Sequence, residues 1–133
     1  MDTYKLEWTV LEQKVFSLLC KMAGEKLSQR EIAKLLEVSP TAVSNSITGL
    51  RRFNIAKLEK TKTINFISFN RDEPKAAALK RAENLKNIYI SGLSDYLEAE
   101  LPGGTIILFG SYSKGEDTNN SDIDLAVIER KDK

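Results

Sequence analysis

The run from Thr105 to Ile128 constrains the fold of this chain more than any other segment. Its first part, Thr105–Phe109, is apolar on both faces and β-branched at its start, which predicts a buried strand. Gly110 and Ser111 then turn the chain, and a polar loop follows. Residues 122–128, with the sequence DIDLAVI, alternate at their start between acidic and apolar side chains, which predicts a second strand.

The polar residues of this run have the chemistry of a site for phosphate and metal. In a strand, Asp122 and Asp124 point to one face about 7 Å apart. Two such carboxylates repel each other unless a cation lies between them, and Mg²⁺ both takes oxygen ligands and shares phosphate oxygens. Gly110 allows close backbone approach, the Ser111 turn presents free amides and a hydroxyl, and Lys114 adds a positive charge. We therefore expect Mg²⁺ together with ATP or another nucleoside triphosphate.

The composition narrows the chemistry further. The chain has 133 residues, a net charge of +1 and 41% apolar residues, which suits one ordinary domain or two small ones. It contains no histidine, which excludes Ser-His-Asp and Cys-His mechanisms and the usual zinc sites. Its single cysteine, Cys20, excludes an internal disulfide and lies among apolar residues, so we expect a core thiol. No run reaches transmembrane length and no signal peptide is evident, so we expect a cytoplasmic protein without a membrane partner.

Three helices are predicted in the first half of the chain. Each follows a hydroxyl-bearing residue suited to be an N-cap, and these residues are Thr9, Ser28 and Ser39. The predicted helices end near residues 23, 38 and 53. Pro40 occupies the first position of the third helix, where its missing N–H costs nothing. The short turn between the second and third helices is typical of a helix-turn-helix.

The exposed face of the third helix carries short hydrogen-bonding side chains and two arginines, which suit base edges and phosphates. They are Thr41, Ser44, Asn45, Thr48, Arg51 and Arg52. Residues 55–60 and 64–69 predict a β-hairpin whose basic tip holds Lys62. Residues 39–71 carry six basic side chains and one acid, Glu59, which favours a polyanionic partner over a structural bundle with a solvated polar face. Three helices and such a hairpin resemble a winged helix-turn-helix domain over residues 6–70, which implies double-stranded DNA as the partner.

Residues 70–74 mark a boundary, which predicts domains at 1–72 and 73–133. From Pro74 to Leu101 the sequence predicts one helical run of about 28 residues and roughly 42 Å, with a weak point at Ser91-Gly92. Such a helix is long enough to bridge two domains or to form the seam of a homodimer. We expect its second half to pack on the sheet that follows.

Residues 90–130 resemble the DNA polymerase beta-like nucleotidyltransferase superfamily, in particular its small prokaryotic minimal nucleotidyltransferases. The resemblance rests on Gly110-Ser111, on Lys114-Gly115 where that branch usually has Arg-Gly, and on the run 121–125 with the sequence SDIDL. It implies that Ser111 binds the terminal phosphates and that Asp122 and Asp124 are the catalytic ligands of two Mg²⁺ ions. Lys114 keeps the charge of the family's arginine but lacks its bidentate fork. The expected fold class is α+β, with a winged helix-turn-helix, a long linking helix and the start of an α/β domain with a small mixed sheet.

One departure from that family bears on catalysis. The family has a third carboxylate on a later strand, whereas only residues 129–133 follow Ile128 in this sequence. The sequence therefore predicts either a piece of a longer protein or a domain that binds a nucleotide without transferring it. It also predicts that the strand at 122–128 is left as an exposed edge.

Three functions remain open from the sequence. One is a winged-helix transcriptional regulator whose second half binds a nucleotide, and which by resemblance would suit an antitoxin that pairs with a small toxin. Another is an active Mg²⁺-dependent enzyme that transfers a nucleoside monophosphate to an acceptor protein or other acceptor, using residues beyond Lys133. The third is a helical adaptor with neither activity. The missing carboxylate favours the regulator for this sequence.

Overall fold

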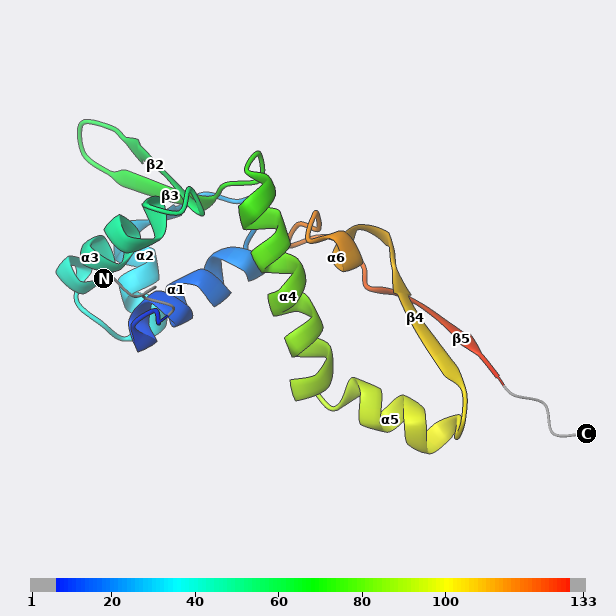
Figure 1. The fold of residues 1–133 in the computed structure, drawn as a ribbon. Coiled ribbons are helices and arrows are strands. Elements are labelled where there is room, and N and C mark those ends of the chain that lie inside the picture. Colours follow the sequence, from blue (N-terminus) through cyan, green and yellow to red (C-terminus); the bar gives the residue numbers. More distant parts are fainter. Residues whose placement is uncertain (1–6, 130–133) are drawn as a thin grey trace, which may run out of the picture. The chain divides into compact units, whose positions relative to one another are not determined.

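The computed structural model describes residues 7–129, and its elements are labelled in Figure 1. The chain divides into two compact units, of which the first ends at Ala76 and the second begins at Ala77. Both units combine helices with a small sheet, which confirms the predicted α+β class.

The first unit contains the three expected helices, α1 (Val10–Lys21), α2 (Gln29–Leu36) and α3 (Pro40–Arg51). Thr9 and Glu12 form a complete capping box at the start of α1, with both reciprocal hydrogen bonds present. Ser28 and Ser39 accept backbone N–H bonds of 3.1 Å at the starts of α2 and α3. The predicted N-caps are therefore confirmed.

A three-stranded antiparallel sheet completes this unit. Its hairpin consists of β2 (Ala56–Lys60) and β3 (Asn65–Phe69), as predicted, and its order is β1-β3-β2. The strand β1 (Leu27–Ser28) was not predicted, and it pairs with β3 in the register Leu27↔Ile67. A strand of two residues has no periodicity to detect, and it forms because β3 offers it an edge.

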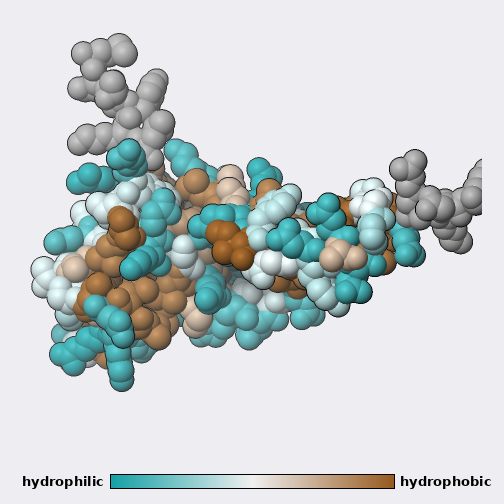
Figure 2. Space-filling view, turned by 90° about the horizontal axis from the view of Figure 1, so that it is seen from below, coloured by the Kyte–Doolittle hydropathy of each residue, from teal (hydrophilic) through white to brown (hydrophobic). Residues whose placement is uncertain are grey.

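The core of the first unit lies between the three helices and the inner face of the sheet. Its largest fully buried apolar residues are Val15, Leu19, Ile32, Val43, Leu50, Ile55 and Ile67. Cys20 is buried among these residues, which confirms the predicted core thiol. Figure 2 shows that apolar residues also gather on one outer face of the helical part, and Val10 and Leu35 are among the exposed apolar residues of this unit.

The helix predicted over 74–101 is two helices, α4 (Pro74–Ile90) and α5 (Leu93–Glu100). They are separated at the predicted weak point, where Gly92 adopts a φ of 83° as the cap before α5. Only glycine enters this left-handed region without a steric penalty, which explains why the break occurs there. The predicted helix is therefore not continuous over its 28 residues, and the homodimer through it stays a prediction.

The rest of the second unit is β4 (Thr105–Phe109), α6 (Gly110–Lys114) and β5 (Asp124–Ile128). The two strands pair antiparallel, from Thr105↔Ile128 to Phe109↔Asp124. A mixed sheet was expected, but within residues 7–129 both sheets contain antiparallel pairs alone. β5 also begins two residues later than predicted, so that Asp122 precedes the strand.

The apolar residues of β4 are not buried as the sequence predicted. Ile106, Ile107 and Phe109 are all exposed, at 38%, 42% and 49%. The prediction assumed layers on both faces of the strand, and a sheet of two strands within residues 7–129 does not supply them. No helix in the described part of the chain is long and apolar enough to cross a membrane.

Candidate functional site

The geometry of the second unit centres on Gly110 and Asp124. The register pairs Phe109 with Asp124, so the next residue, Gly110, lies beside the first residue of β5. Gly110 has a φ of 78°, and a β-carbon built on it would overlap Asp124 Oδ2 and lie 3.2 Å from Asp124 Cγ. The backbone conformation favours glycine at this position, and a β-carbon there would require the Asp124 carboxylate to move.

The other predicted phosphate ligands belong to α6, which begins at Gly110. Ser111 lies in its first turn and is partly buried, whereas Lys114 lies in its last turn and is exposed. The Ser113 hydroxyl donates to the Gly110 carbonyl at 2.7 Å, which ties the start of the helix to its end. The structure thus brings Gly110, Ser111 and Asp124 into one short stretch at the end of the sheet.

Asp122 is exposed and lies just before β5, so the strand alternation that was to align it with Asp124 does not reach it. The preceding loop is held by its own hydrogen bonds, since Ser121 Oγ accepts from the Thr118 N–H at 2.9 Å. Among residues 7–129 no group of three or more acidic, cysteine or histidine side chains is placed to hold a metal ion. Asp122 and Asp124 are a pair of oxygen donors, and oxygen is the ligand type that Mg²⁺ prefers.

Sequence reasoning missed four residues whose hydrogen bonds connect α4 to α6 and to the loop after it. They are Lys80, Asn84, Asp117 and, within α6 itself, Tyr112. Lys80 and Asn84 lie on a face of α4 that is buried although it is polar. A search for apolar periodicity cannot find such a face.

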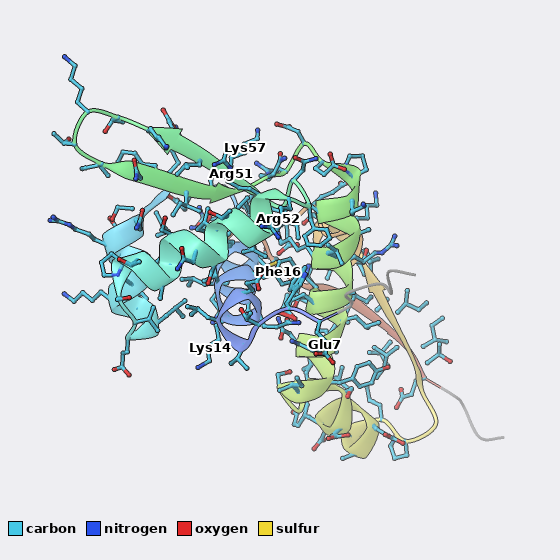
Figure 3. The ribbon with its side chains drawn as sticks, turned by 60° about the vertical axis from the view of Figure 1, so that its left-hand side comes forward. Glu7, Lys14, Phe16, Arg51, Arg52 and Lys57 are labelled. Carbon is cyan, nitrogen blue, oxygen red and sulfur yellow. The ribbon has the colours of Figure 1, made fainter. Side chains whose placement is uncertain are left out.

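In the first unit, every residue predicted to contact DNA lies on the surface. The residues of α3 predicted for this role are all exposed, as are Arg52 and Lys62; on α3 they are Thr41, Ser44, Asn45, Thr48 and Arg51. Figure 3 shows Arg51 and Arg52 at the end of α3 and Lys57 on the hairpin. Thr48 donates its hydroxyl to the Ser44 carbonyl at 3.1 Å, so this side chain is held against its own helix.

The tip of the hairpin is an ordered turn. Thr61 and Ile64 exchange three hydrogen bonds, one between backbone groups at 2.9 Å and two through the Thr61 hydroxyl at 2.7 and 2.9 Å. These bonds fix the backbone on either side of Lys62. The position of this cation relative to the sheet is therefore set by the turn.

A cleft of about 430 Å³ opens between the starts of α2 and α3 and the hairpin. It is lined by Ser28, Gln29, Arg30, Pro40, Thr63, Ile64 and Asn65. The Gln29 side chain spans it, donating to the Pro40 carbonyl at 2.7 Å and accepting from Asn65 at 3.4 Å. Sequence reasoning did not identify this cleft, because it depends on how β1 joins the hairpin to α2.

The comparisons with known proteins address the two units separately. A family model described as a nucleotidyltransferase domain matches residues 90–133, which include α5, α6 and both strands of the second sheet. No curated protein matches the chain.

Several solved structures have a winged-helix fold similar to that of this chain. One point mutant of ZitR from Lactococcus lactis has a TM-score of 0.51 at 16% identity, with 75% of this chain and 66% of that chain covered. Another mutant of ZitR, in complex with DNA, has a TM-score of 0.53 at 15% identity, with 77% of this chain and 68% of that chain covered. The adhesin competence repressor AdcR from Streptococcus pyogenes has a TM-score of 0.52 at 15% identity, with 72% of this chain and 69% of that chain covered.

The match to the first of these ZitR structures spans just under two thirds of its length. At sequence identities of 15–16%, these matches show that the fold is similar. The chain therefore combines a winged helix-turn-helix with a segment that matches a nucleotidyltransferase domain.

Proposed function

We propose that this protein is a DNA-binding regulator whose second unit holds a Mg²⁺-bound nucleoside triphosphate. DNA is bound by the exposed face of α3 and by the hairpin, which acts as the wing. The nucleotide phosphates are bound by Gly110, Ser111 and Lys114, and the metal by Asp122 and Asp124.

The packing of Asp124 against Gly110 carries the nucleotide part of the proposal. A carboxylate at the surface is normally surrounded by water, whereas this one lies against a glycine in a conformation that favours glycine alone. Any larger residue at this position would displace the carboxylate from the start of α6. The match of residues 90–133 to a nucleotidyltransferase domain supports the same assignment.

The chemistry of the donors fits the metal. Asp122 and Asp124 offer carboxylate oxygens, and Mg²⁺ binds through one or two carboxylates together with the phosphates of its substrate. When bound, the cation would neutralise phosphate charge and hold the phosphates against the protein. The Ser111 hydroxyl and the Lys114 ammonium would donate to phosphate oxygens on the other side.

The DNA part of the proposal rests on the first unit alone. The exposed side chains of α3 are of the kinds that hydrogen-bond to base edges and phosphates. The basic balance of residues 39–71 supplies the charge that phosphate binding requires. The same fold occurs in a structure of ZitR in complex with DNA and in a protein named as a repressor.

Isothermal titration calorimetry with ATP tests the nucleotide site. We expect the wild-type protein to bind ATP in the presence of Mg²⁺ and much more weakly with EDTA. Asp124→Asn should weaken Mg²⁺–ATP binding about tenfold or more, because it removes a charged metal ligand. Asp95→Asn, which changes an exposed aspartate of α5, is the matched control. Equal affinities of the Asp124→Asn and Asp95→Asn variants would refute the site.

A further inference from the structure

The segment that carries the proposed phosphate ligands is not self-supporting. α6 has five residues, Gly110–Lys114, and isolated helices of this length do not form in water because helix nucleation is unfavourable. Its cap residue, Phe109, makes no side-chain capping bond. The conformation of Ser111 therefore depends on the contacts that the rest of the second unit makes with α6.

Asn84 on α4 and Tyr112 on α6 form two hydrogen bonds, and each residue is the donor in one of them. The Asn84 side-chain amide donates to the Tyr112 carbonyl at 3.0 Å, and the Tyr112 hydroxyl donates to the Asn84 carbonyl at 3.1 Å. Asn84 is only 4% exposed, so water competes poorly for these groups. The middle of α6 is thereby held at a fixed position along α4.

The same amide and a buried lysine hold the loop that leaves α6. Asn84 also donates to Asp117 Oδ1 at 2.8 Å, and Lys80 Nζ lies 3.1 Å from the same oxygen. Lys80 donates to the Asp117 carbonyl as well, and its side chain is 1% exposed. A lysine buried this deeply is costly unless it is paired, so its site needs Asp117 in place.

Gly115 makes the third attachment, at the end of α6. Its φ is 72°, and a β-carbon built on it would overlap the Ala77 carbonyl and lie 2.9 Å from the Arg81 nitrogen. Backbone therefore packs directly on backbone at this point. Ala77, Lys80, Arg81 and Asn84 follow helical spacing along one face of α4, and Figure 1 shows α6 beside the first part of that helix.

We propose that Asn84 and Lys80 are positioning residues for the proposed nucleotide site. They fix α6 and the loop after it, and so place Ser111 next to Asp124 without touching the ligand. This inference rests on the proposed Mg²⁺–nucleotide function and extends it to α4, a helix that lies outside the matched nucleotidyltransferase segment apart from its last residue, Ile90.

Calorimetric titration of two variants with Mg²⁺–ATP tests the proposal, at a temperature where circular dichroism shows every variant to be folded. Asn84→Ala removes the two hydrogen bonds that the side-chain amide donates, to the Tyr112 carbonyl and to Asp117, and leaves the backbone carbonyl that accepts from the Tyr112 hydroxyl. We expect its Kd to rise about tenfold. Tyr112→Phe deletes a single hydroxyl, which leaves packing intact, and should raise Kd about threefold. The matched controls are Asn87→Ala, on the exposed side of α4, and Tyr96→Phe, on α5.

Amide hydrogen exchange of residues 110–114, followed by NMR, gives a second measurement that does not depend on the ligand. The two variants should exchange these amides faster than the controls do. A merely structural role would lower the melting temperature but leave the Kd of the folded molecules unchanged, and that result would overturn the proposal. If the wild-type protein does not bind ATP at all, the proposed nucleotide function fails together with this inference. If the wild-type protein binds ATP and the variants bind it equally well, only the positioning role fails.

Discussion

The Asp124 carboxylate lies against the Cα of Gly110, at the point where the first strand of the second sheet ends and its partner begins. This contact joins two motifs that are separated by a polar loop in the sequence, the Gly-Ser turn and the Asp-x-Asp motif at the start of β5. It makes the glycine a partner of the carboxylate as well as a turn residue.

Gly110→Ala should therefore weaken Mg²⁺–ATP binding about tenfold or more, because the new methyl group displaces the carboxylate and disfavours the backbone at a φ of 78°. Calorimetric titration measures the change. Gly103→Ala is a close control, since Gly103 has a φ of 76° but nothing within 4 Å of the added carbon. Both variants carry the backbone penalty of about 1 kcal/mol, and the first alone carries the overlap. Similar affinities of the two variants would show that the contact with Asp124 is unimportant.

The arginines at the end of α3 give a prediction about DNA. Replacing Arg51 and Arg52 with alanine should weaken binding to duplexes of any sequence and reduce the salt dependence of log K by about two, one for each lost phosphate contact. Fluorescence anisotropy over a range of salt concentrations measures both quantities. Lys14→Ala, which changes an exposed cation on α1, should leave the slope unaltered. An unaltered slope in the double variant would favour a structural three-helix bundle.

If DNA binds as proposed, the cleft between α2, α3 and the wing would be a further place for its backbone to lie. Arg30 lines the cleft and is exposed, so in the proposed complex its guanidinium would lie near the phosphates that flank the groove bound by α3. Arg30→Ala should reduce DNA affinity about five- to tenfold without changing the preferred sequence. Selection from a random duplex library would check this, and a changed consensus sequence would place Arg30 at a base instead.

The ion pair of Lys57 and Asp72 provides a pH prediction. The hydrogen bond and the charge of Lys57, at 2.6 Å, hold the pKa of Asp72 below its ordinary value, and Arg71 adds to this effect. A lowered carboxylate pKa stabilises the fold at pH values above the ordinary pKa, and this stabilisation disappears as the pH falls through the lowered value. Lys57→Ala should raise the pKa of Asp72 towards the ordinary value, as measured by NMR titration. A pKa that does not move would mean that the pair is not populated in solution.

The parts of the fold that the sequence predicted are those specified by local chemistry. Thr9, Ser28 and Ser39 predict the starts of helices because an N-cap side chain bonds to a backbone amide only two or three residues further on. The hairpin and the break at Gly92 are also short-range features. So is the Gly-Ser turn, whose glycine is required by its own backbone angle.

The parts that were missed depend on residues far apart in the sequence. Lys80 and Asn84 are polar, so their burial against Asp117 cannot be inferred from hydrophobic periodicity. Conversely, Ile106 and Phe109 are apolar enough for a buried strand, and their exposure depends on which other layers are present. The candidate ligands of the site remain a prediction from a local motif, whereas the packing around them could not be predicted from that motif.

Ser28 belongs to two structures at once, since it pairs with Phe66 in the sheet and caps α2 through Glu31. The sheet that carries the wing is therefore joined to α2 without any intervening loop. If α3 and the wing bind DNA as proposed, a duplex whose groove spacing differs from the spacing of these two elements would have to deform, at an energetic cost that depends on its base sequence. The protein would then discriminate between operators partly by their stiffness, at base pairs that no side chain reaches.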